Sequence, residues 1–120
     1  QMAEPKSEMV IFDDLKDALG IVKEDTGFDS ELSMYISESM DTLKQLGAVN
    51  EYMEYDESMK WSDIISTPEF THTPYGMVRL FVMLSTKITF DPPSPSNVSY
   101  VQAKIDQLAW RIREEYSYSG

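Results

Sequence analysis

The sequence contains no cysteine and only one histidine, His72, among its 120 residues. The lack of cysteine excludes a disulfide framework, thiol catalysis and any metal site built on cysteine. A single histidine beside a candidate helix start is more typical of a capping or surface group than of a catalyst. The sequence also lacks a glycine-rich phosphate loop, a nucleophile elbow and the acidic spacing of a calcium loop. We therefore expect no enzymatic activity, no cofactor and no bound metal.

No long apolar run is free of charge. The most apolar stretch, residues 74–90, is interrupted by Arg79 and Lys87, which makes it too short and too charged to cross a bilayer. No signal-peptide pattern opens the sequence. We expect no contact with a membrane.

Positive charge is scarce, and the net charge is −11. Residues 1–60 carry fifteen acidic and five basic residues, whereas residues 61–120 carry six and five. An acidic surface repels phosphate, and stable binding to nucleic acid needs basic contacts. Solubility is the simplest explanation of this charge, and the alternative is a surface that must not bind an anionic molecule.

The hydrophobic periodicity predicts four helices, near residues 13–19, 29–46, 74–90 and 97–116. Pro74 fits a first helical position, and Asp91 before Pro92 ends the third helix. Gly20 and Gly47 are candidate C-terminal caps of the first two helices. The expected fold is all-α, a small helical bundle of about four helices with a long irregular loop, residues 48–72, between the second and the third.

Residues 74–90 are apolar nearly all round, which predicts a central helix covered on most sides. We expect three of its side chains, Leu80, Phe81 and Leu84, to pack against the second and fourth helices. The expected contacts there are the apolar residues Leu32, Ile36, Leu43, Val101, Ile105 and Leu108.

The expected organisation is a single helical domain over residues 13–116, between a flexible N-terminus, residues 1–12, and a flexible tail, residues 117–120. The loop 48–72 mixes Tyr52, Tyr55 and Trp61 with acidic residues, which favours a protein contact surface because aromatic residues are enriched at interfaces. In the alternative interpretation, Trp61 and Ile64 fold back onto the core.

The last helix carries one apolar stripe and a second group of residues beyond it. Trp110, Arg111, Arg113 and Tyr118 lie off the stripe or beyond its end, and Tyr116 closes it. Tryptophan, tyrosine and arginine dominate interface hot spots, so this end of the helix is a candidate contact for a partner.

Several short motifs, taken in order, resemble the head–tail connector (adaptor or head-completion) proteins of long-tailed bacteriophages. The similarity covers residues 13–116, and the loop 50–72 lies outside its pattern. The matching pieces are Asp14-Leu15-Lys16, Leu19-Gly20-Ile21, Phe28-Asp29-Ser30-Glu31-Leu32, Leu46-Gly47-Ala48, Phe90-Asp91-Pro92-Pro93 and Leu108-Ala109-Trp110-Arg111.

The resemblance implies a structural virion protein, assembled in the host cytoplasm into a ring of typically twelve copies. Such a ring docks under the portal and forms the platform for the next neck or tail-completion protein, while DNA passes through the lumen without specific binding. The candidate portal contacts are Trp110, Arg111, Arg113, Tyr116 and Tyr118, and the candidate subunit or neck contacts are Tyr52, Tyr55 and Trp61. The alternative function is a small acidic regulator that binds a basic partner in competition with nucleic acid.

Overall fold

The computed structural model describes residues 8–64 and 73–119, apart from the side chains of residues 73–75 and 116–119. This part of the chain forms helices and contains no strand, which confirms the expected all-α bundle. The helices are α1 (Ile11–Ala18), α2 (Asp29–Gln45), α3 (Trp61–Ile64), α4 (Thr73–Phe90) and α5 (Pro95–Ser119).

Both predicted glycine caps are present. Gly20 and Gly47 have positive φ values of 78° and 85°. At the end of α2, the N–H of Gly47 donates to the carbonyl of Lys44, and the N–H of Ala48 donates to that of Leu43. The equivalent pair of bonds, donated by the N–H groups of Gly20 and Ile21, ends α1. This pattern requires a left-handed backbone conformation, which glycine adopts without strain.

Two helix ends differ from the sequence expectation. α1 begins at Ile11, two residues before the expected start, and both Ile11 and Phe12 are buried. α5 begins at Pro95 and continues to Ser119, so residues 117–119 are helical although we expected a flexible tail there. Proline fits the first turn of a helix because its missing N–H would have no helical acceptor there, which explains the early start.

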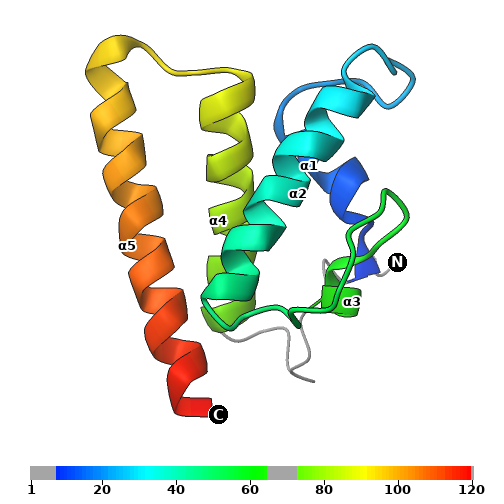
Figure 1. Cartoon of the computed structure of the whole chain (residues 1–120). Helices are drawn as coiled ribbons and strands as arrows, with labels where there is room; N and C mark the ends of the chain where they lie inside the picture. The colour runs from blue at the N-terminus through cyan, green and yellow to red at the C-terminus, as the bar shows by residue number, and fades with distance from the viewer. Residues whose placement is uncertain (1–7, 65–72, 120) are drawn as a thin grey trace, which may run out of the picture.

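Helix α4 lies between α2 and α5 and packs against both (Figure 1). α2 and α5 run in the same direction, and α4 runs in the opposite direction. α1 packs beside α2. Next to α1, the chain on either side of Val10 pairs with the start of α3, through Ile11 N to Met59 O at 2.8 Å and Trp61 N to Met9 O at 3.2 Å.

The core lies where α4 meets its neighbours. On α4, the buried side chains include Phe81 and Val82. Leu80 was expected there too, but it is 36% exposed, and Leu84 is only partly buried. Because Leu80 is two residues from Val78 and from Val82, the helical pitch turns it away from both. The remaining expected core contacts are buried, namely Leu32, Ile36, Leu43, Ile105 and Leu108, while Val101 is partly buried.

The expected loop between the second and third helices contains the short helix α3. Trp61 and Ile64 are 0% and 5% exposed, so they fold back onto the core, as in the alternative interpretation of this segment. His72 lies outside the described residues.

Candidate interaction surfaces

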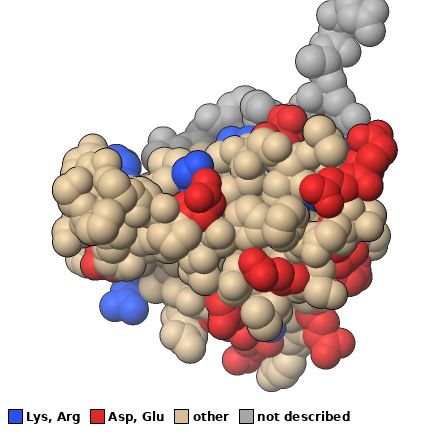
Figure 2. All heavy atoms as spheres, turned by 90° about the horizontal axis from the view of Figure 1, so that it is seen from above, with Lys and Arg blue, Asp and Glu red and all other residues tan. Residues whose placement is uncertain are grey.

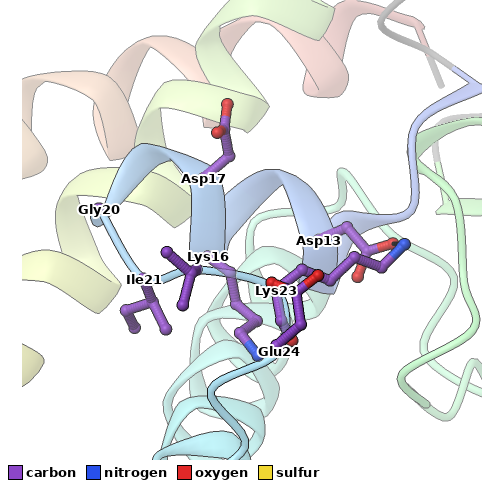
Figure 3. A pocket seen from close by; sticks show the side chains of 8 residues that line it. Asp13, Lys16, Asp17, Gly20, Ile21, Lys23 and Glu24 are labelled. Carbon is purple, nitrogen blue, oxygen red and sulfur yellow. Dashed lines mark hydrogen bonds and ion pairs between the residues drawn. The ribbon is translucent and has the colours of Figure 1, made fainter.

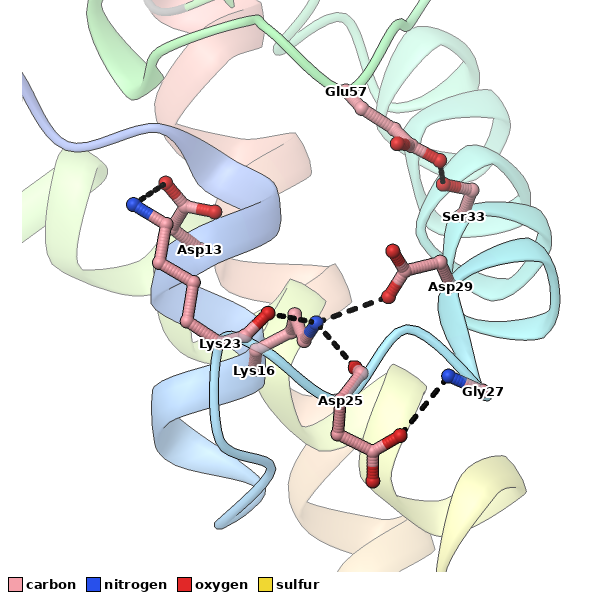
Figure 4. A network of polar contacts seen from close by, with 8 residues as sticks. All are labelled: Asp13, Lys16, Lys23, Asp25, Gly27, Asp29, Ser33 and Glu57. Carbon is pink, nitrogen blue, oxygen red and sulfur yellow. Dashed lines mark hydrogen bonds and ion pairs between the residues drawn. The ribbon is translucent and has the colours of Figure 1, made fainter.

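The loop between α1 and α2 is fixed by one buried lysine. The ammonium of Lys16 donates to the carbonyls of Lys23 and Asp25 at 3.1 and 2.7 Å, and to Oδ1 of Asp29 at 3.0 Å (Figure 4). The Lys16 side chain is 4% exposed. Three acceptors satisfy the three donors of an ammonium group. Lys16 therefore connects α1 to the loop and to the first residue of α2.

A shallow hollow of about 490 Å³ lies between α1 and this loop (Figure 3). Asp13, Lys23 and Glu24 gather on one side of it, and Asp17 points away from them. Lys23 and Asp13 form a loose ion pair at 3.8 Å. Asp13 and Lys23 therefore compensate each other's charge. The charged groups of the hollow do not converge on one point, which a reacting substrate would require.

A second polar cluster is buried beneath α1. Arg79 of α4 donates to both carboxylate oxygens of Asp14, at 2.7 and 2.8 Å, and the indole N–H of Trp61 donates to Oδ2 of Asp14 at 2.9 Å. Asp14 is 2% exposed. This carboxylate joins α1, α3 and α4. The pairing of Asp14 with Arg79 and Trp61 was not predicted from the sequence. Two features of the sequence could have indicated this pairing. Asp14 follows Ile11 by three residues, on the apolar face of its helix, and Arg79 interrupts the apolar stretch 74–90.

The candidate subunit or neck contacts are not equally accessible. Tyr52 is 84% exposed, whereas Tyr55 is partly buried and Trp61 is fully buried. Burial raises the pKa of Tyr55 above its usual value of 10.0, and the nearby Glu57 carboxylate raises it further. Glu57 itself accepts a hydrogen bond from Ser33 of α2. Tyr52 therefore presents the most side-chain surface to a partner, and Trp61 serves the core instead.

The end of α5 presents an aromatic and cationic surface. Trp110 is 61% exposed, and Arg111 and Arg113 are exposed beside it. The buried side chains of this helix, Ile105, Leu108 and Ile112, face the rest of the bundle. Tyr116 and Tyr118 belong to the same helix, and their side chains lie outside the described residues.

Acidic side chains gather on the side of the molecule formed by α1, α2 and their loops, and few appear on the side formed by α5 (Figure 2). Within the described residues, no group of three potential ligands is placed to hold a metal ion. No helix in residues 8–64 and 73–119 combines the length and hydrophobicity needed to cross a bilayer. The fold and its surfaces define a small helical protein with an aromatic and cationic surface at the end of α5 and an acidic surface over α1 and α2.

Residues 11–119 match the family described as phage connector protein, and the chain belongs to this family. The match covers all five helices, including the Asp14 and Lys16 clusters and the exposed end of α5. No curated protein and no solved structure matches the chain. The family is structural, so the protein is a phage structural connector, a component of the virion that contacts other head or tail proteins.

Proposed function

We propose that the chain is one subunit of a ring-shaped adaptor, in which residues 13–116 act as a single connector domain. The ring binds the portal on one side and the next neck or tail-completion protein on the other, and the genome passes through its lumen. The observation that carries this proposal is the family match, which extends over the whole helical bundle. Twelve copies remain the expected ring size.

The portal contact that we propose is the end of α5. Trp110 is 61% exposed on a helix whose apolar stripe already packs in the core, so the indole side chain of Trp110 is available to a partner. Arg111 and Arg113 add exposed cationic groups beside it. Tyr116 and Tyr118 complete this proposed contact. Tryptophan, tyrosine and arginine are the residue types enriched among interface hot spots, which cluster near the centre of an interface.

The acidic half of the chain is proposed to face the DNA path or open solvent. Residues 1–60 carry ten more acidic than basic residues. A surface with this excess is costly to bury against a neighbour that does not compensate its charge. It also repels phosphate, which allows DNA to slide past without binding. Tyr52 and Tyr55 are proposed as contacts with the neck protein or a neighbouring subunit.

Electron microscopy of the protein mixed with purified portal rings tests the adaptor function. We expect an added ring layer on one face of the portal. Arg113→Glu should reduce docking in a pull-down without changing the circular dichroism spectrum, because Arg113 is exposed. Lys87→Glu is the matched control, since it makes the same charge inversion at an exposed position of α4.

Two results would contradict this proposal. If wild-type protein adds no layer to the portal but binds a basic protein stoichiometrically and displaces nucleic acid from it, the regulator is the correct function. If Arg113→Glu and Tyr118→Ala both dock at wild-type levels, the end of α5 is not the anchor. Tyr52→Ala then tests the aromatic and acidic segment 51–65 as the alternative contact.

A further inference from the structure

Helix α2 carries an acidic stripe on the face that points away from the core. Glu31, Met34, Glu38 and Asp41 are all exposed. Spacings of three and four residues place them on one side of the helix. Met34 is 54% exposed, which puts an apolar side chain among three carboxylates. The opposite side of α2 is buried, so this stripe has no role in the subunit core.

Helix α5 carries a basic stripe with a similar layout. Tyr100, Lys104, Gln107 and Arg111 are all exposed, and spacings of four and three residues align them. Tyr100 is 74% exposed. The four positions hold two cations and no acid. Trp110, the main residue of the proposed portal contact, lies to one side of this stripe because it is one residue before Arg111, which is about 100° around the helix.

The two stripes match in register. α2 and α5 run in the same direction, and Phe28 before α2 contacts Phe90 at the end of α4, with ring centroids 5.2 Å apart (Figure 1). Both helices therefore start at the same end of the bundle. Met34 follows the first residue of α2 by the same number of positions as Tyr100 follows the first residue of α5. The same equality holds for Glu38 and Lys104.

We infer that the α5 stripe of one subunit binds the α2 stripe of a second copy of this chain. In that contact Met34 packs on Tyr100, and Glu38 pairs with Lys104. Within one subunit α4 lies between the two helices, so the stripes belong to different surfaces. Contact between two different surfaces is heterologous, and it closes into a ring when the rotation between copies allows it. The inference rests on the proposed ring and names the faces that build it.

Charge complementarity supports this partner. Neither Glu38 nor Lys104 forms an ion pair within the described part of the chain, so no partner among those residues competes for them. Asp41 has only a loose ion pair to Lys44, at 3.7 Å. Acidic side chains crowd the α1 and α2 side of the molecule (Figure 2), so a neighbour that brings cations relieves repulsion there.

The absence of cysteine allows a clean cross-linking test. Met34→Cys protein is mixed with isotope-labelled Tyr100→Cys protein, with and without portal, and treated with a short thiol-reactive cross-linker. We expect mixed dimers to exceed both same-site dimers by about tenfold, because a heterologous contact brings unlike faces together. A mixture of Val22→Cys and Lys87→Cys protein is the control, because both positions are exposed and neither belongs to a proposed contact. A yield no higher than this control in both samples would overturn the inference.

Charge reversal gives a second measurement on the same variants. Lys104→Glu or Glu38→Lys alone should lower the cross-linking yield about tenfold, since like charges then meet in the contact. The two changes together should restore it, whereas Lys87→Glu should leave it unchanged. Failure of the combined variant to recover would contradict the proposed pairing.

The outcomes separate this inference from the proposed function. Rings that form on the portal without a Met34–Tyr100 cross-link would refute the two stripes and leave the adaptor function intact. Cross-linking without any binding to the portal would support the stripes and refute the adaptor function.

Discussion

The most informative perturbation is removal of the Asp14 carboxylate. Asp14→Ala removes two acceptor oxygens from the Arg79 guanidinium and one from the Trp61 indole N–H. Breaking a buried ion pair by removing one partner costs about 3–5 kcal/mol. Because the Arg79 side chain is 23% exposed, water compensates part of the loss, and we expect about 3 kcal/mol. That is a large fraction of the roughly 5–15 kcal/mol of a typical domain.

Urea unfolding followed by fluorescence measures this cost. The chain contains two tryptophans, so a Trp110→Phe background leaves buried Trp61 as the only tryptophan, and it can be excited selectively over the tyrosines. We expect the unfolding midpoint of Asp14→Ala to fall with little change in slope, because the surface exposed on unfolding is nearly the same. The emission of Trp61 in the folded state should also change, since its N–H loses an acceptor.

A paired substitution shows whether the charge or the shape matters. Asp14→Leu with Arg79→Met replaces the ion pair with apolar groups, which is often nearly neutral for a buried pair. We expect the paired variant to lose about 1–2 kcal/mol, because the Trp61 N–H loses its hydrogen bond to the Asp14 carboxylate. This loss is smaller than that of Asp14→Ala alone. A loss below about 1 kcal/mol for Asp14→Ala, or strict additivity of the two single changes, would refute the reasoning.

Three further predictions concern folding stability, each measured as a change in the free energy of unfolding. Lys16→Met should cost about 2–3 kcal/mol and speed hydrogen exchange in residues 21–28, because three acceptors lose their donor. Thr86→Val should stabilise by about 1 kcal/mol, since the Thr86 hydroxyl is buried without a partner among the described residues. Phe81→Ala should cost about 3–5 kcal/mol and Leu84→Ala clearly less, because only Phe81 is fully within the core; equal costs would contradict the observed face of α4.

The parts of the fold that depend on local rules could be predicted from the sequence. Gly20 and Gly47 end helices because few other residues tolerate the required φ, and Asp91 before Pro92 marks the end of α4. The apolar spacing in α2 placed Leu32, Ile36 and Leu43 correctly in the core. Each of these signals lies within a few residues of the feature that it predicts.

The parts that depend on distant contacts could not be predicted in the same way. α4 is apolar nearly all round, so periodicity does not show which stripe faces the core, and Leu80 was placed there wrongly. Tryptophan suits an interface or a core equally well, so the sequence around Trp61 does not show which one it occupies. The buried carboxylate that accepts its N–H belongs to Asp14, 47 positions away in sequence. Exposure of Trp110, in contrast, followed from its position off the apolar stripe of α5.

The two buried polar clusters and the two exposed stripes have a physical connection in the proposed ring. A ring closes only if the angle between its two contact surfaces is fixed, since a small error at each contact accumulates around the circle. The surface on α2 and the surface on α5 are joined through α4, which packs against both helices. Arg79 fixes α4 to α1 through Asp14, and Lys16 fixes α1 to the start of α2. Directional bonds resist rotation of one helix against another better than apolar contacts do, because the latter tolerate sliding. In the ring that we propose, Asp14 and Lys16 therefore set the geometry of assembly, and their loss should broaden the distribution of ring sizes in addition to lowering stability.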